Sequence, residues 1–291
     1  MSPERRDESG DAPRIAVIIP CHGEGRLLAD AVASIEEPEP VHIVVVDDLS
    51  PDEETRQTLS ELEAAGIEVL RLEHNVGVGR ARMAALALTS SRYVFPLDAD
   101  DLAVPGVLST MADRLDADPG AVACVGDILE FGDNELVRAV PQWLDPYRVA
   151  YTNEYPISAL FRRSALDEIG GWHRDWTGQQ GYEDWHVWMG FAERRRRIAH
   201  LGPGVVGYRR RLHGSRLNAE VKRRHAELYG VMRGDHPELF RALPEHRRRS
   251  DLSRLRKLLY PVVYGARAEV PFERRIKPWL DRLGIWTLVR R

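Results

Sequence analysis

An apolar run at residues 93–97 leads directly into three closely spaced carboxylates, those of Asp98, Asp100 and Asp101. Crowding negative charges in this way costs free energy unless a cation or hydrogen-bond donors compensate for it. Carboxylate oxygens suit Mg²⁺ or Mn²⁺, ions that keep several waters and bridge to substrate phosphates. The segment therefore indicates a divalent metal site, and a solvated turn that caps a helix is the alternative interpretation.

A second carboxylate pair, Asp47 and Asp48, follows the apolar residues 44–46. Carboxylates there could accept hydrogen bonds from a nucleobase imide or a ribose hydroxyl, whereas the alternative role is to cap the helix that begins near Asp52. Residues 77–82 form a glycine-containing turn whose basic residues enter a helix, which suits phosphate binding. Together these segments indicate a site for a nucleoside diphosphate.

The elements that must position these residues follow a regular alternation of short β-branched runs and amphipathic segments of helical length. This pattern predicts βαβ units around a mostly parallel sheet, in which ligands bind beyond the carboxyl ends of the strands. Asp52 is the expected cap of the second helix and Gly66 its expected stop. The expected strands are residues 15–20, 41–46, 67–72, 93–97 and 121–125, and the expected helices are residues 26–35, 52–65 and 78–88.

The periodicity is less regular after residue 126, and residues 126–181 are expected to form an irregular rim. Within it, residues 157–169 predict a strand followed by a helix that ends at two glycines. A helix near Tyr182 and a strand at residues 205–209 follow. From Arg216 onward we expect helices, with Pro261, Pro271 and Pro278 as breaks.

These motifs, taken in order, resemble glycosyltransferase family 2, whose members adopt the GT-A fold. The resemblance covers roughly residues 14–215. It implies an α/β, Rossmann-like fold in which a mixed, mostly parallel sheet is flanked by helices. We therefore expect a flexible N-terminus at residues 1–13, the glycosyltransferase domain at residues 14–215, and a basic helical C-terminal extension at residues 216–291.

On the donor side, the resemblance concerns the turns after the first three strands and Arg82, which follows the third turn. The next residue, Met83, stands where the family usually has asparagine. The nucleotide-sugar-binding residues that it implies are Pro20, His22, Glu24, Asp47, Asp48, Gly77, Arg82 and Asp98. The family's Asp-x-Asp motif implies Asp98 and Asp100 as metal ligands. An altered Arg-x-His-x-x-Ser element, lengthened here by arginines, implies His213 as a further ligand.

On the acceptor side, Gly170-Gly171-Trp172 resembles the family's acceptor loop, and Glu183-Asp184 resembles its Glu-Asp motif. The resemblance implies that Asp184 is the catalytic base. The expected acceptor-binding residues are Trp172, Trp176 and Glu183. Aromatic residues at helical spacing are more often core than ligand contacts, so Trp188 is expected in the core.

The expected function is an inverting transfer of a sugar from a nucleotide-diphosphate sugar to an acceptor hydroxyl, with Mn²⁺ or Mg²⁺. The acceptor could be a glycan, a lipid-linked molecule or a small metabolite. A catalytically inactive module that binds a nucleotide sugar or a glycan is one alternative, and a sugar nucleotidyltransferase is another, although its Gly-rich first loop with Arg and Lys is missing. A dinucleotide-dependent oxidoreductase is disfavoured, because Leu28 stands where its fingerprint needs a third glycine.

The bulk composition, with 43% hydrophobic and 30% charged residues, is that of an ordinary globular protein. Two cysteines cannot form a disulfide framework, and neither a secretory signal nor a membrane-spanning run is visible, so we expect a cytoplasmic protein without a nucleic-acid partner. Residues 209–291 carry 22 Lys and Arg but only 9 Asp and Glu. This basic tail predicts either peripheral contact with the inner face of a membrane or a packed, solvated helix.

Overall fold

The computed structural model describes residues 12–132, 135–172, 181–212, 224–264 and 282 of the chain. Its contacts divide the chain into two compact units. Unit 1 comprises Met1–Trp143, Pro156–Gln180 and Arg197–His213, and unit 2 comprises Leu144–Tyr155, Gly181–Arg196 and Gly214–Arg291. The division of the chain at residues 13 and 215 stays a prediction.

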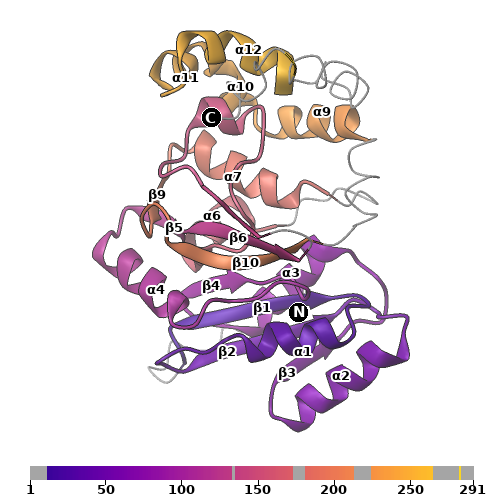
Figure 1. Ribbon diagram of the computed structural model, residues 1–291. Helices are drawn as coiled ribbons and strands as arrows, with labels where there is room; N and C mark the ends of the chain where they lie inside the picture. The colour runs from indigo at the N-terminus through magenta and orange to yellow at the C-terminus, as the bar shows by residue number, and fades with distance from the viewer. Residues whose placement is uncertain (1–11, 133–134, 173–180, 213–223, 265–281, 283–291) are drawn as a thin grey trace. The chain divides into compact units, whose positions relative to one another are not determined.

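Unit 1 contains a seven-stranded sheet in the order β3-β2-β1-β4-β8-β5-β9 (Figure 1). Its strands are β1 (Ile15–Cys21), β2 (Val41–Asp47), β3 (Glu68–Arg71), β4 (Tyr93–Pro96), β5 (Ala121–Val125), β8 (Leu160–Arg162) and β9 (Arg197–His200). Strand β8 is antiparallel to β4 and β5, whereas the other neighbours pair in parallel. The predicted mixed, mostly parallel sheet is confirmed.

Strand β1 shows why the parallel strands are visible in the sequence. All seven of its residues are buried, as expected for a strand in a parallel sheet that is covered on both faces. Its register pairs Ile15 with Val41 and Cys21 with Asp47, so β1 and β2 end at the same edge of the sheet. The residues that follow both strands are therefore brought together.

The described part of unit 1 contains the helices α1 (Arg26–Ala33), α2 (Glu53–Ala64), α3 (Val78–Leu88), α4 (Val107–Ala117) and α6 (Arg163–Ile169). Helix α3 packs on β1 and β2, and α4 packs on β5 and β8. The side chain of Asp52 accepts a hydrogen bond from the Thr55 amide, which confirms the predicted cap of α2. Gly66 follows the end of α2 with a φ of +91°, as expected of a stop.

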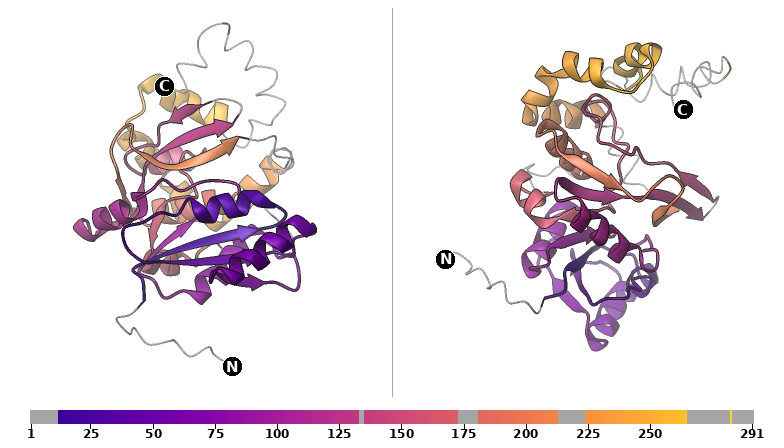
Figure 2. Two further views of the ribbon diagram at one scale, coloured as in Figure 1. Left: turned by 60° about the horizontal axis from the view of Figure 1, so that its bottom comes forward. Right: turned by 90° about the vertical axis from the view of Figure 1, so that its left-hand side faces the viewer.

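The expectation of an irregular rim is wrong for part of residues 126–181. Strands β6 (Asp127–Gly132) and β7 (Leu136–Arg138) join β10 (Val206–Leu212) in a second sheet, in the order β10-β6-β7. Figure 2 shows β10, in orange, beside β6. Strand β6 pairs in parallel with β10, a partner far away in the sequence, so its local pattern gives little sign of it.

Two glycines allow the backbones at the start of β6 and β10 to approach closely. A Cβ atom at Gly126 would lie 2.6 Å from the Gly207 nitrogen, and one at Gly207 would lie 2.8 Å from the Gly126 nitrogen. Both distances are below those that real Cβ atoms show, and the obstructing atoms are backbone. Glycine is therefore required at both positions for this packing of β10.

Unit 2 is helical, with α5 (Pro146–Val149), α7 (Glu183–Glu193), α9 (His225–Asp235), α10 (Pro237–Arg241), α11 (Leu243–Arg249) and α12 (Arg254–Tyr264). Tyr147, Leu252 and Tyr260 form a buried cluster that joins α5 to α12. Among the described residues, no helix has the length and apolar character needed to cross a bilayer.

The prediction that Pro261 breaks a helix is wrong, because Pro261 lies inside α12. A proline in a helix leaves the carbonyl four residues earlier without its usual donor. Here that carbonyl belongs to Lys257, and it accepts a hydrogen bond of 2.6 Å from the Tyr147 hydroxyl. A side chain from α5 thus replaces the missing backbone donor. Pro271 and Pro278 lie outside the described residues.

Changing Gly126 to Ala is expected to lower the free energy of unfolding by about 2 kcal/mol, because the new methyl group meets backbone that cannot move aside cheaply. Gly230 provides the matched control, since it lies in α9 with open space around its Cβ position. Gly230→Ala is expected to raise the stability by up to about 1 kcal/mol. Urea unfolding of both variants checks this, and an unchanged midpoint for Gly126→Ala would contradict it.

Candidate functional site

The carboxyl ends of β1, β2 and β4 lie at one edge of the main sheet. Strand β1 pairs in parallel with both β2 and β4. The backbone continues this pairing beyond the strands, because the amide of Asp48 donates to the carbonyl of Cys21 and the amide of Leu97 donates to that of Ile18. The segments predicted to bind the donor therefore start from adjacent positions.

The turn after β1 is tied to the segment after β2. The amide of Gly23 donates to the Ser50 hydroxyl at 3.2 Å, and Nδ1 of His22 lies 2.9 Å from the carbonyl oxygen of Asp48. The amide of His22 donates to Glu24 at 2.5 Å. Burial raises the pKa of Glu24, and the charge of Asp100 raises it further. Glu24 thus belongs to the same electrostatic environment as the acidic turn after β4, which contains Asp98, Asp100 and Asp101.

Asp47 and Asp48 are both buried, with 6% and 4% of their surface exposed. Oδ1 of Asp47 accepts a hydrogen bond from the Ser50 amide at 2.8 Å. The two oxygens of Asp48 accept from the amides of Val76 at 2.6 Å and Gly77 at 2.8 Å. Asp48 therefore holds the turn that starts α3, and direct contact of either aspartate with a nucleotide stays a prediction.

Arg82 of α3 is buried, with only 3% of its side chain exposed, and donates to Oδ1 of Asp98 at 2.6 Å. This charge-assisted bond orients the first aspartate of the acidic turn. The neighbouring Met83 packs against Gly171. A Cβ atom added to Gly171 would lie only 2.4 Å from the Met83 sulfur. The methionine that replaces the family's asparagine thus has a packing role.

Asp98 and Asp100 are partly exposed, whereas Asp101 is buried. Oδ1 of Asp101 accepts a hydrogen bond from the Arg211 amide at 2.8 Å. Burial and then the charges of Asp98 and Asp100 raise the pKa of Asp101 to about 8. The turn therefore presents two aspartates to solvent and uses the third to attach itself to β10.

Strand β10 supplies two site residues that were missed by the sequence analysis. Arg209 forms an antiparallel backbone bridge with Leu102, and Nε of Arg211 donates to the carbonyl of Asp100 at 3.1 Å. Both guanidinium groups lie 4.8 Å from the ring centre of Phe131 in β6. The run of arginines that lengthens the family's element was the signal that could have identified them.

In unit 2, Asp184 lies in the first turn of α7, next to Glu183. Its Oδ2 accepts from the Asn153 side chain at 2.8 Å, and its Oδ1 accepts from the Trp185 amide at 2.7 Å. A carboxylate at a helix N-terminus is stabilised by the helix dipole. These two hydrogen bonds hold the Asp184 carboxylate in one orientation.

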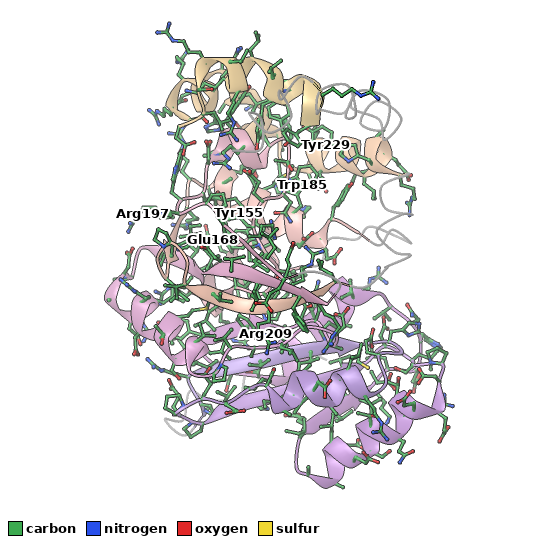
Figure 3. The ribbon with its side chains drawn as sticks, in the orientation of Figure 1. Tyr155, Glu168, Trp185, Arg197, Arg209 and Tyr229 are labelled. Carbon is green, nitrogen blue, oxygen red and sulfur yellow. The ribbon has the colours of Figure 1, made fainter. Side chains whose placement is uncertain are left out.

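Aromatic rings surround this helix terminus. The Trp185 ring stacks on His225 and Tyr229 at centroid distances of 6.4 and 5.7 Å, and Figure 3 labels Trp185 and Tyr229 in this group. The Tyr182 hydroxyl lies 2.9 Å from Nδ1 of His225. Burial raises the pKa of Tyr182 to about 12, and the charge of Asp184 contributes to this shift. The rings thus form a cluster beside Asp184.

The other tryptophans have separate positions. Trp188 is completely buried, as predicted. Trp172 is 4% exposed and packs edge-on against Phe161 at 5.9 Å within unit 1. Its role in acceptor binding, like that of Glu183, stays a prediction. Trp176 and His213 lie outside the described residues.

Comparison with known proteins decides the family. The model of "Glycosyl transferase family 2" matches residues 16–170, which is more than half of the chain. The chain belongs to this family. The predicted resemblance is confirmed, and the matched region includes the turns that hold Glu24, Asp48 and Asp98.

Individual relatives of this family 2 chain are distant. The succinoglycan biosynthesis protein ExoU of Rhizobium meliloti (strain 1021) is 35% identical over 99 residues, which is 33% of this chain. The match spans 29% of ExoU, so the chain covers less than a third of that relative.

Solved structures confirm the fold. S. aureus TarS 1-349 in complex with UDP-GlcNAc has a TM-score of 0.59 at 19% identity, and the match covers 84% of this chain and 69% of that one. The mannosyltransferase PcManGT from Pyrobaculum calidifontis, in complex with GDP-Man and Mn²⁺, has a TM-score of 0.57 at 20% identity, with 96% and 84% covered. The GT-A-type fold class is therefore as predicted.

The acidic turn of the family 2 domain fits a divalent cation shared with a ligand. Among the described residues, no three His, Cys, Asp or Glu side chains are arranged to hold a metal ion. Mg²⁺ is commonly bound by one or two carboxylates together with substrate phosphates and waters, so a complete protein cage is not required. The carboxylates of Asp98 and Asp100 are accessible, and their charges add to the larger effect of burial in raising the pKa of Asp101.

Asp48→Asn is expected to lower the free energy of unfolding by about 1–3 kcal/mol, because the amide nitrogen cannot accept the hydrogen bond from Val76 or Gly77. The turn before α3 should loosen, and affinity for a nucleotide ligand should fall with it. Urea unfolding and nucleotide titration test both effects. Asp167→Asn, at an exposed position of α6, is the control. Equal stability of the two variants would contradict the assigned role of Asp48.

Proposed function

We propose that the chain is an inverting glycosyltransferase that moves a sugar from a nucleoside-diphosphate sugar to an acceptor hydroxyl. The observation that carries this proposal is the acidic turn after β4, with Arg82 bonded to Asp98 and with Glu24 under the influence of Asp100, in a family 2 chain. Neighbours of the same fold were solved with UDP-GlcNAc or with GDP-Man and Mn²⁺, which supports a donor of this class.

The carboxylates of Asp98 and Asp100 are the proposed ligands for Mn²⁺ or Mg²⁺, with His213 as a further ligand. A divalent ion held there would offset the negative charge of the departing diphosphate. Arg82 keeps Asp98 in place through the bond to Oδ1, and β10 supports the turn through Arg211. The chain's own residues thus fix the turn without completing the ion's coordination.

Asp47 is the better candidate for a contact with the nucleotide. Among the described residues, only its Oδ1 accepts a hydrogen bond, whereas both oxygens of Asp48 accept from backbone amides. Pro20, His22 and Gly77 support the donor site through the backbone that they shape. Glu24, Asp48, Arg82 and Asp98 complete the proposed set of donor-side residues.

The carboxylate of Asp184 is the proposed general base. In the transfer, the acceptor oxygen forms a bond to the anomeric carbon while the bond from that carbon to the diphosphate oxygen breaks. The hydroxyl proton passes to Asp184, and the nucleoside diphosphate leaves with the bonding electron pair. Asn153 and the Trp185 amide hold the carboxylate in position for this proton transfer.

Loss of the Asp100 carboxylate is expected to remove metal-dependent donor binding while the fold is preserved. UDP, GDP and their sugars are screened by thermal shift with and without Mn²⁺. A ligand at about 100 times its Kd stabilises the folded protein by about 2.7 kcal/mol. The Mn²⁺-dependent part of this shift should be absent in Asp100→Asn and present in Asp118→Asn, an aspartate outside the acidic turn. A full Mn²⁺-dependent shift in Asp100→Asn would refute the metal assignment.

Asp184→Asn is expected to lower kcat by about a hundredfold or more with little change in donor affinity, because the amide cannot take up the acceptor's proton. Asn153→Ala should lower kcat by about fivefold to tenfold, since one hydrogen bond to the carboxylate is lost. Steady-state kinetics and the anomeric configuration of the product are the measurements. The exposed Asp251 provides the control variant Asp251→Asn. Wild-type kcat for Asp184→Asn, or a product of retained configuration, would exclude this mechanism.

A further inference from the structure

Helix α12 has an apolar face in water in addition to the one that it buries. Tyr260 is 1% exposed and packs in the cluster with Tyr147 and Leu252. Leu255 and Leu258 are 57% and 60% exposed, and their spacing places them together on another face of the helix. A single exposed leucine needs no explanation, but a pair one turn apart forms a small apolar patch.

Exposed cations surround this patch. Residues 243–264 contain six Arg and Lys but only two Asp and Glu. One of those carboxylates, Glu245, is already shared by Arg195 at 3.5 Å and Arg249 at 3.0 Å. In the part of the chain that the structure describes, Arg247, Arg248 and Arg254 are exposed and form no ion pair.

This combination of exposed leucines and unpaired arginines is not found at another exposed apolar pair of the chain. Leu136 and Val137 of β7 are 61% and 47% exposed. The cation next to them, Arg138, forms an ion pair with Glu130 at 3.4 Å, a carboxylate that Arg210 shares at 3.7 Å. Only at α12 do we find exposed leucines next to uncompensated arginines among the described residues.

We propose that the α11–α12 surface, defined by Arg247, Arg248, Arg254, Leu255 and Leu258, docks on an anionic lipid bilayer. Interfacial helices combine leucines that enter the boundary between headgroups and acyl chains with cations that contact anionic lipids. A protein partner would need carboxylates to match these arginines, whereas a bilayer supplies both the phosphates and an apolar layer. The surface is formed by described residues and lies within the basic tail of residues 209–291.

The test is flotation of the full chain with phosphatidylcholine vesicles that contain or lack phosphatidylglycerol. Wild-type protein should bind only the anionic vesicles, and added salt should weaken the binding. Arg247→Gln/Arg248→Gln should weaken it by about fivefold for each arginine removed. Leu255→Gln/Leu258→Gln should weaken it by about tenfold or more, because the apolar contribution is lost.

Two matched controls separate this surface from a general effect of charge or apolar exposure. Leu136→Gln/Val137→Gln removes an exposed apolar pair of β7, and Arg92→Gln/Arg197→Gln removes two cations of unit 1 whose side chains are 60% and 66% exposed. Both controls should bind anionic vesicles like the wild type. All four variants change exposed side chains, and equal midpoints in urea unfolding confirm that they fold.

Absence of binding to anionic vesicles overturns the proposal, and so does binding that neither the arginine nor the leucine pair weakens. Equal binding to neutral vesicles overturns the role of the arginines. Light scattering tests the other possible occupant of this surface, a second copy of the chain. If the wild-type chain self-associates, the leucine variant is monomeric and no vesicle binding is seen, then the patch is an interface between copies and the membrane proposal fails.

Discussion

Carboxylates crowded at the end of β4 are the constraint on which the rest of the site depends. Burial and mutual repulsion raise the pKa of Asp101 to about 8 and raise that of Glu24. Removing ions from water costs several kcal/mol for each ion even after the protein relaxes. The chain compensates with the buried Arg82 and with the backbone of Arg211, but these groups do not neutralise the whole cluster. The proposed divalent cation would offset part of this negative charge.

The same constraint explains why unit 1 needs its second sheet. The acidic turn has to be attached to something that supplies donors, and β10 does this through its backbone amide at Arg211 and its bridge from Arg209 to Leu102. Strand β10 runs beside β6, with which it pairs in parallel, and the two backbones approach most closely where Gly126 and Gly207 touch. Packing between two glycines thus determines the position of a strand that supports the proposed metal ligands.

The sequence predicts those parts of the fold whose physical cause is local. Strand β1 is covered on both faces, so its continuous apolar run is visible without any knowledge of its partners. Strands β6 and β10 pair across a long stretch of chain, and their stability depends on a contact that no local pattern records. Pro261 shows the same limit, because the rule that proline ends a helix is sound until Tyr147 supplies the missing donor to Lys257.

The candidate site shows a related limit at its carboxylates. Sequence patterns locate an aspartate at a strand end but cannot distinguish a side chain that binds a ligand from one that binds the backbone. Asp48 holds the turn before α3 with both oxygens, while its neighbour Asp47 accepts only one hydrogen bond among the described residues. Neighbouring carboxylates therefore have different capacities for a ligand. The difference arises because Val76 and Gly77 present their amides to Asp48, a geometry set by the fold of the turn and not by residue type.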